Sequence, residues 1–355
     1  MGDGSGTRVP TRLIARIVSE VQQGMLATLT PRLSAVAGKQ LQFGSAILAL
    51  ILLRNHPRFR AAGTGVSAPA AVAEPVPMSV NAAAATLHRP FETMRRHALA
   101  LRGTGLLDEN ARALAISEAF MANEACEALL LALHDWIVSL AEDLAAIGVP
   151  LPVGRLDLPY RPDVTIAVAI DLGLTPFEFL AGRYVHWIDL VLVNAVVTAS
   201  TRHWTYDPEI SWRYAWPETP PPRELRLPVS LPRVAQAHGL TLSTVNRHAR
   251  AAIESGMLMR VPGGVLASEA FLEGETIVKG GTAAAGRTLQ ALSRLVPGGF
   301  RFDSPATCYA VGRPNRLDYA PPSSSAAARQ AGSFLRRSIS IAVRPSPSGI
   351  SPRAP

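Results

Sequence analysis

A short polar segment, residues 241–258 (TLSTVNRHARAAIESGML), holds the side chains whose chemistry can be interpreted most directly. It places two hydroxyl groups, one carboxamide and two guanidinium groups close together on the chain: Ser243, Thr244, Asn246, Arg247 and Arg250. Hydroxyl groups suit the phosphate oxygens of a nucleic acid. A carboxamide or a guanidinium can form two hydrogen bonds with the edge of one base. These residue types therefore suit contacts with a nucleic acid, provided that one element presents them together.

The segment has a near relative earlier in the chain, at residues 90–107 (PFETMRRHALALRGTGLL). The two copies align without a gap at an offset of 151 residues, from Pro77 and Pro228 to the sequence SEAF at 117–120 and 268–271. Agreement over such a length predicts the internal duplication of a domain-sized unit. Identical pairs along this register include Ser79/Ser230, Ala84/Ala235, Thr93/Thr244, Arg96/Arg247, His97/His248, Ala98/Ala249, Gly105/Gly256 and Leu107/Leu258.

Apolar helical segments flank each copy. Residues 33–55 and 177–200 precede the copies, and residues 118–148 and 269–296 follow them. The last of these helices is expected to break at its adjacent glycines, Gly280 and Gly281. The domain organisation that follows is a disordered N-terminus, two repeats joined by a proline-rich linker, and a basic, mostly disordered tail. The predicted boundaries are 1–11, 12–148, 149–163, 164–300 and 301–355, in that order.

Cap and turn residues in the second copy predict two short helices and a hairpin. Ser230 and Thr241 can each cap a helix, and Gly239 supplies the left-handed conformation that the turn between the helices needs. Residues 257–267 are typical of two short strands around a Pro-Gly-Gly turn. The second helix carries an apolar stripe at helical spacing: Val245, Ala249, Ala252 and Ile253.

Helix, tight turn, helix and hairpin together resemble a winged helix-turn-helix DNA-binding domain. Ala235, Gly239 and Val245 have the spacing of that family, in which a small residue on the first helix lets the two helices approach closely. The sequence STVNRHA resembles the start of the recognition helix in regulators of the catabolite-activator-protein and multiple-antibiotic-resistance-regulator types. The resemblance covers only this part of each repeat. It implies a mainly α fold with short β-hairpin wings, built as two tandem winged-helix domains with flanking long helices.

A recognition helix of that family lies in the major groove and presents its N-terminal residues to base edges. The resemblance therefore implies recognition helices at residues 242–255 and, in the first repeat, at residues 90–103. In the second repeat the DNA-binding candidates are Ser243, Thr244, Asn246, Arg247 and Arg250 on the helix and Arg260 in the hairpin. In the first repeat they are Arg95 and Arg96.

The first repeat departs from this pattern in ways that weaken it as a DNA reader. His88 stands at the glycine position, where a side chain makes the left-handed turn costly. Glu92 replaces a serine of the recognition helix, and the hairpin carries Asp108 and Glu109 where phosphate contacts need cations. We expect the first repeat to read DNA weakly, to read it through its helix alone, or to serve protein contacts.

An aromatic cluster precedes the second copy, with Trp204, Trp212 and Trp216 as its largest members. These residues are candidates for an effector pocket, since aromatic side chains are common in such sites. The alternative is a loop packed by its own side chains. His97 and His248 match each other in the two repeats, and we interpret them as packing residues rather than as a metal or pH site.

Composition limits the other functions. The formal net charge is +8, but residues 301–355 contain eight arginines and only two aspartates, so the rest of the chain is close to neutral. The tail is expected to add nonspecific DNA affinity. Cys126 and Cys308 suggest neither a disulfide framework nor a metal site. We find no phosphate-binding glycine loop, metal-ligand spacing or nucleophile motif, so no enzyme activity, metal or cofactor is predicted.

The longest apolar run, 44–53, is shorter than the roughly 20 residues that span a bilayer, and the N-terminus lacks a secretory signal. The sequence favours a cytoplasmic, nucleoid-associated bacterial protein that binds double-stranded DNA with sequence specificity, as a transcriptional regulator. Two alternatives are a plasmid-type replication initiator and a scaffold that uses winged helices for protein contacts. Further expectations are a small-molecule effector and either a homodimer or an intrachain pseudo-dimer that reads half-sites about one DNA turn apart. Recognition helices that face opposite sides of the molecule would contradict the pseudo-dimer.

Overall fold

The computed structural model describes residues 8–63, 76–109, 113–179, 184 and 186–321. These residues form a mainly helical protein, and their named strands make one two-stranded antiparallel sheet. The predicted mainly α class with a β-hairpin is therefore confirmed. No helix in the described ranges is both long enough and apolar enough to cross a membrane.

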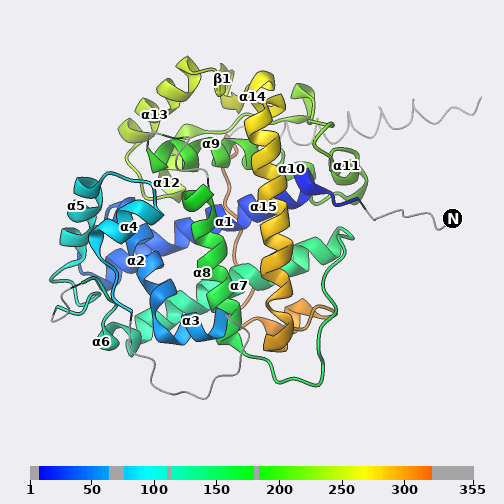
Figure 1. The fold of residues 1–355 in the computed structure, drawn as a ribbon. Coiled ribbons are helices and arrows are strands. Elements are labelled where there is room, and N and C mark those ends of the chain that lie inside the picture. The colour runs from blue at the N-terminus through cyan, green and yellow to red at the C-terminus, as the bar shows by residue number, and fades with distance from the viewer. Residues whose placement is uncertain (1–7, 64–75, 110–112, 180–183, 185, 322–355) are drawn as a thin grey trace, which may run out of the picture.

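The helices follow each other in two series of the same order (Figure 1). Unit 1 consists of α1 (Thr11–Val36), α2 (Phe43–Asn55), α3 (Pro57–Gly63), α4 (Val80–Thr86), α5 (Phe91–Leu101), α6 (Glu118–Met121) and α7 (Glu124–Ala146). Unit 2 consists of α8 (Pro162–Phe179), α9 (Trp187–Ala199), α10 (Arg202–Thr205), α11 (Pro208–Arg213), α12 (Leu231–Ala237), α13 (Leu242–Glu254), β1 (Leu258–Val261), β2 (Gly264–Ala267), α14 (Glu269–Glu273) and α15 (Glu275–Ser293).

Individual backbone contacts recur in the two units at the same offset as the sequence repeat. Met78 pairs with Leu114 in an isolated antiparallel bridge, and 151 residues later Val229 pairs with Val265 in the same way. In each unit the chain that follows the two short helices therefore folds back and pairs with a residue two positions before the first of them. Other matching pairs are the bridges Leu107–Ile116 and Leu258–Ala267, and the 2.6 Å hydroxyl-to-carbonyl bonds Ser117–Gly105 and Ser268–Gly256.

Long helices of each unit pack against long helices of the other unit. α1, the first helix of unit 1, packs against α7 of its own unit and against α15, the last helix of unit 2. α8, the first helix of unit 2, packs against α7 of unit 1. One buried apolar core consequently runs through both units and includes Leu13, Ile17, Val138, Ile170 and Leu292. This packing fixes the two units relative to each other.

The last helix is continuous, so the predicted break at Gly280 and Gly281 is wrong. A Cβ atom at Gly281 would lie 3.6 Å from the Cβ atom of Ala15, which places this glycine against α1. Glycine costs a helix roughly 1 kcal/mol relative to alanine. Packing against α1 and burial of Ala285 and Leu292 on the same helix outweigh that cost.

The apolar segments 33–55 and 177–200, each predicted as one helix, contain helix boundaries instead. α1 ends and α2 begins within the first, and α8 ends and α9 begins within the second. The starts of α2 and α9, Phe43 and Trp187, are 144 residues apart, whereas the hairpins repeat at 151. The connection from α9 to α12 in unit 2 is therefore longer than the connection from α2 to α4 in unit 1.

The turn before α5 and the turn before α13 both need a left-handed residue. Gly239 has a φ of 62°, as predicted, and His88 at the equivalent position has a φ of 49°. Among the described residues, His88 is the one non-glycine residue with a positive φ. A side chain in this conformation costs roughly 1–2 kcal/mol. Unit 1 therefore contains backbone strain that unit 2 avoids.

We expect His88→Gly to raise the free energy of unfolding by about 1 kcal/mol, because glycine adopts this conformation at little cost. Gly239→Ala is the matched opposite change and should lower the free energy of unfolding by a similar amount. Urea denaturation of both variants beside the wild type measures the two effects. A less stable His88→Gly variant would show that the imidazole contributes more than the strain costs.

The sequence predicts a disordered tail from residue 301, but residues 301–321 are ordered against the body, so this boundary is wrong. Residues 322–355 lie outside the described residues, as do residues 1–7 of the predicted N-terminal extension. The buried carboxylate of Asp135 on α7 accepts three backbone N–H groups at 2.9 Å each, from Ala310, Val311 and Gly312. Arg316 forms an ion pair of 2.6 Å with Asp143 on the same helix. These contacts with α7 order a segment whose composition alone predicts disorder.

Tyr319 connects the same segment to unit 2. Its hydroxyl oxygen lies 2.9 Å from Nε2 of His238, at the end of α12, and the two rings stack with centroids 6.0 Å apart. The backbone N–H of Ser230 donates to the carbonyl oxygen of Tyr319 over 2.9 Å. Only 2% of His238 is exposed, and this burial lowers its pKa to about 4. The segment that ends in Tyr319 thus contacts both units, and the imidazole of His238 in this contact is neutral.

Acidification is expected to destabilise the fold through His238. Its pKa in the unfolded chain is about 6.5, so on acidification the unfolded state binds the proton first. The stabilisation is complete above about pH 6.5 and is lost as the pH falls towards 4, with an upper limit of roughly 3 kcal/mol. Urea unfolding at about pH 7 and about pH 5 should show a smaller loss for His238→Gln than for the wild type. Equal losses in the two proteins would contradict this assignment.

Candidate nucleic-acid interface

A small apolar core holds α12 and α13 of unit 2 together. Val245, Ala249 and Ala252 of α13 belong to one buried cluster with Val234 and Ala235 of α12. The small side chains of the alanines at the contact allow the two helices to approach closely. α13 therefore turns one face inward and leaves the opposite face to solvent.

The outward face of α13 carries the contact residues that the sequence predicts for this helix. Its N-terminus is capped by Thr241, whose hydroxyl oxygen accepts the backbone N–H of Thr244 over 3.3 Å. The face therefore begins with hydroxyl groups and continues with an amide and two guanidinium groups. Thr244 is half-buried, and the exposed members are Ser243, Asn246, Arg247 and Arg250.

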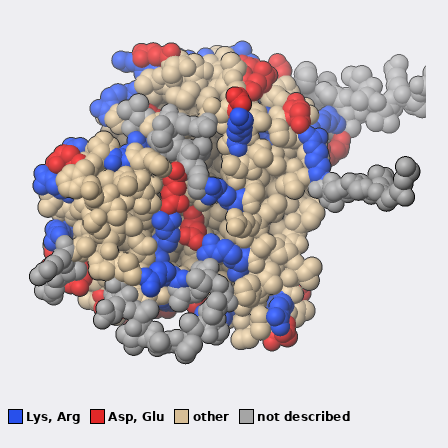
Figure 2. Space-filling view, in the orientation of Figure 1, with Lys and Arg blue, Asp and Glu red and all other residues tan. Residues whose placement is uncertain are grey.

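Three exposed guanidinium groups in this part of unit 2 form no ion pair within the described ranges. They belong to Arg247 and Arg250 on α13 and to Arg260 on β1. Arg247 makes a long contact of 3.4 Å between Nη2 and Nε2 of its neighbour His248. Figure 2 shows basic side chains along the edge of the molecule over α13. Exposed arginines without carboxylate partners are suited to phosphate groups or base edges.

The hairpin that follows α13 contacts the residues that precede α12. A Cβ atom at Gly264 would lie 2.1 Å from the carbonyl oxygen of Val229, so a side chain at this position would collide with backbone. The adjacent Val265 forms the backbone bridge with Val229 and is fully buried. The Pro-Gly-Gly turn thus lets β1, β2 and the backbone at Val229 lie close together. It also positions β1, which carries Arg260.

Unit 1 places its candidate residues differently. Arg95 and Arg96 are both exposed on α5. The guanidinium of Arg95 donates two hydrogen bonds to the carboxylate of Glu92, of 2.9 and 2.8 Å, and this hydrogen bonding lowers the pKa of Glu92. Arg96 forms no ion pair within the described ranges. In unit 1 one of the two candidate arginines is therefore already neutralised by its own helix.

The start of α9 contacts the second short helix of both units. On the unit 1 side, the ring of His97 on α5 stacks on Trp187, with centroids 6.1 Å apart and planes 17° apart. On the unit 2 side, Oδ1 of Asp189 lies 2.6 Å from Nδ1 of His248 on α13. α5 and α13 therefore both approach the start of α9 (Figure 1).

Both matching histidines pack against the helix that precedes their own pair of helices. Nδ1 of His97 lies 3.2 Å from the hydroxyl of Ser45 on α2, and Gly44 leaves space for the ring. Burial lowers the pKa of His97. His248 is 5% exposed. The described residues contain no group of side chains that could hold a metal ion.

The three candidate tryptophans do not line the groove of about 380 Å³ between α1, α9 and α15. Trp204 is fully buried and donates its indole N–H to the carbonyl oxygen of Leu225 over 2.7 Å. Trp212 donates to the carbonyl oxygen of Ile147 over 2.7 Å, and its ring lies 6.1 Å from that of Trp216. Trp212 and Trp216 therefore pack together beside the end of α7, whereas the ring of Trp204 packs against Tyr214. Their role in an effector pocket stays a prediction.

Comparisons of the chain with protein-family models, with curated proteins and with solved structures find no match. The functional interpretation therefore depends on the residues of this chain. Asp189 is the contact residue that sequence reasoning missed. The sequence marks Asp189 only by its position, 144 residues after Ser45, which contacts His97 in unit 1.

We expect Asp189→Asn to lower the free energy of unfolding by roughly 1.5–3 kcal/mol, the usual range for a hydrogen bond to a charged group. The change removes the carboxylate that joins α9 to α13 through His248. Urea denaturation measures the loss. Glu92→Gln removes a carboxylate from an exposed pair on α5 and should leave stability nearly unchanged. Equal effects of the two changes would show that the Asp189–His248 contact does not stabilise the fold.

Proposed function

We propose that the protein is a sequence-specific double-stranded DNA-binding protein, a bacterial transcriptional regulator in which two winged-helix units form a pseudo-dimer within one chain. The outward face of α13 carries this proposal. It presents hydroxyl, amide and guanidinium groups beside each other, on a helix whose other face is buried against its unit. A helix of this kind, placed in the major groove, reads base edges with its N-terminal residues.

Residue chemistry supports specific roles along the helix. Arg247 suits the two acceptors of guanine, and Asn246 suits the donor and acceptor of adenine. Ser243 and Thr244, next to the N-terminus of the helix, suit a phosphate group, as does Arg250 on a later turn. Arg260 on the hairpin suits the backbone beside the groove. Asn246, Arg250 and Arg260 form no side-chain hydrogen bond or ion pair among the described residues, so these side chains have no such contact to lose when DNA binds.

The pairing of the units supports the pseudo-dimer. The packing of α1 and α8 against helices of the other unit holds the units in one arrangement, and α5 and α13 both approach the start of α9. Two recognition helices held in one arrangement are expected to read the two parts of one DNA site. Because Glu92 occupies Arg95, we expect the half-site of unit 1 to be the weaker one.

The exposed arginines also separate this proposal from a protein scaffold. A protein-binding face commonly has an apolar centre with few charged residues. The outward face of α13 instead combines Arg247 and Arg250 with polar side chains. A replication initiator would use the same DNA chemistry, and the sites that the protein selects distinguish it from a regulator, because an initiator prefers repeated sites at one origin.

The test is selection of genomic fragments by the purified protein at about 150 mM salt with excess nonspecific competitor, since nonspecific affinity falls steeply with salt. We expect the wild type to enrich fragments with a shared, unequal two-part motif. The double variant Asn246→Ala, Arg247→Ala should lose the stronger part of the motif, because each paired contact with a base contributes about 1–3 kcal/mol of discrimination.

Arg32→Ala is the matched control, because Arg32 is an exposed arginine on α1 and not on either recognition helix. It should select the same motif as the wild type. Enrichment of no motif by the wild type, or of the same motif by the double variant, would contradict the proposal. A motif that occurs only as tandem copies at one origin would favour the replication initiator.

A further inference from the structure

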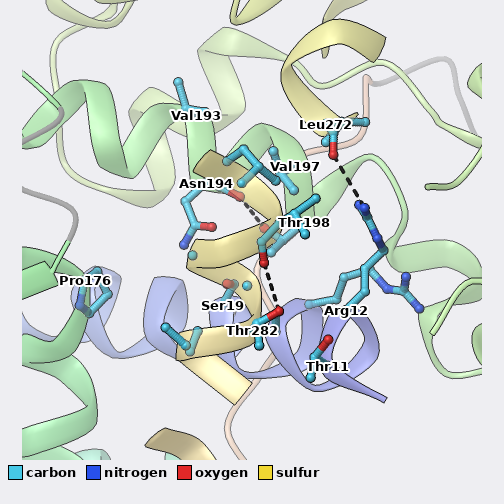
Figure 3. Close-up of a pocket in the computed structure, with 18 of the residues that line it drawn as sticks. Thr11, Arg12, Ser19, Pro176, Val193, Asn194, Val197, Thr198, Leu272 and Thr282 are labelled. Atoms are coloured by element: carbon cyan, nitrogen blue, oxygen red, sulfur yellow. Dashed lines mark hydrogen bonds between the residues drawn. The ribbon is translucent and has the colours of Figure 1, made fainter. Parts of the chain in front are cut away.

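A groove of about 380 Å³ lies between α1, α9 and α15. Figure 3 shows Arg12 near one end and Pro176 near the other, with Thr198 and Thr282 between them and Val193 and Val197 above. Its size falls in the range of sites that bind small molecules. The candidate DNA-contacting residues do not line it.

The groove exists because the last helices of the two units differ. At the common offset of 151 residues, Gly280 and Gly281 of α15 correspond to Leu129 and Leu130 of α7. Both leucines are buried in the core, whereas α15 continues with threonine and alanines that border the groove. α15 therefore covers α1 with a thinner layer of side chains than α7 does. Unit 2 gains a cavity where unit 1 is filled.

One end of the groove carries two arginines that form no ion pair among the described residues. Arg12 and Arg16 are one helical turn apart on α1, and neither has a carboxylate within 4.0 Å among the described residues. Glu218 and Glu273 act on Arg12 from a greater distance, and Glu218 is itself paired with Arg8. Buried charges in proteins are normally paired with an opposite charge.

Arg16 is 6% exposed, and its guanidinium donates to the carbonyl oxygens of Tyr214 and Ser211 over 2.8 and 3.3 Å. Its buried Nε atom has no hydrogen-bond partner. Burial, and next the positive charge of Arg12, lower the pKa of Arg16 to about 9. An anion beside these two residues would compensate an electrostatic cost that the free protein bears.

Most of the remaining surface of the groove is apolar, although Arg226, Lys279 and Arg287 also line it. The wall that α9 contributes includes Leu190, Val193 and Val197, and Ile277 and Val278 of α15 face it. We propose that the groove binds a molecule with an apolar body and a single anionic head group, the head beside Arg12 and the body along α9. The arginine pair fits a carboxylate, and the aliphatic walls fit a hydrocarbon chain or ring.

The position of the groove gives the ligand a regulatory role, and this part rests on the proposed DNA-binding function. α9 is one wall of the groove, while Leu192 and Val196 on the same helix share a buried cluster with Val245 of α13. The backbone carbonyl of Leu272, in the same cluster, lies 3.5 Å from Nη2 of Arg12. A ligand that displaces α9 or Arg12 therefore changes the support of the recognition helix.

Binding is tested with decanoate as the probe, by isothermal titration calorimetry on the full chain without DNA. Decanol has the same body without the charge, and acetate has the charge without the body. We expect decanoate to bind at least tenfold more tightly than either, since a charge-assisted contact and an apolar body each contribute about a factor of ten or more. Equal affinity for decanol and decanoate, or no binding of decanoate, would overturn the proposal.

Two variants locate the site. Arg12→Gln should weaken decanoate binding about tenfold or more, whereas Arg32→Gln, which removes an exposed charge from the same helix outside the groove, should not. Ser19→Phe fills the groove from α1, keeps both arginines and should abolish binding. Circular dichroism shows whether each variant is folded. Unchanged binding in the folded Ser19→Phe variant would place decanoate elsewhere and contradict the proposed site.

Titration of the selected DNA motif with and without saturating decanoate tests the regulatory part. We expect DNA affinity to change at least threefold in the wild type and not at all in Ser19→Phe. An unchanged DNA affinity with intact decanoate binding would overturn the regulatory role and leave the binding site standing. Failure of DNA binding itself is observed without decanoate, so the failure of the proposed function is distinguishable from the failure of the groove.

Discussion

The arrangement of the molecule depends on the burial of α1 by both units. Its apolar side chains, among them Leu13, Ile17, Val21 and Leu33, are buried along the whole helix, and α7 of its own unit covers only part of that surface. α15 of the other unit covers much of the rest. Apolar burial stabilises a fold in proportion to area, so a single unit would expose a large part of its core. The two units are thus one folding unit, and the distance between α5 and α13 is fixed by the core.

The two units share their backbone contacts and differ in the side chains that face solvent. The bridges at Met78 and Val229 and the packed histidines His97 and His248 are common to the two units, because they set the packing of the short helices. The outward faces have no such constraint. Glu92 pairs with Arg95 in unit 1, while Arg247 of unit 2 has no carboxylate partner among the described residues. A shared scaffold with unequal faces suits the reading of an unequal DNA site.

Local signals explain which elements could be predicted from the sequence. The short helices and the hairpin follow from a cap at Thr241, a left-handed glycine at Gly239 and period-3.6 burial, all within a few residues of each other. The continuity of α15 through two glycines depends on Ala15, at the other end of the chain. Likewise, the order of residues 301–321 depends on the carboxylate of Asp135, and the groove depends on which helix faces which. No local pattern contains these contacts.

The two proposed activities meet in α9. One face of this helix lines the groove through Leu190 and Val193, and the other supports α13 through Val196 and the contact of Asp189 with His248. A ligand changes DNA affinity only to the extent that it binds two positions of α9 with different affinity. That coupling is reciprocal, so DNA changes the ligand affinity by the same factor. Because α9 also contacts His97 of α5 through Trp187, a shift of its first turn would alter both recognition helices together, and the fixed core would turn one binding event into a change at both half-sites.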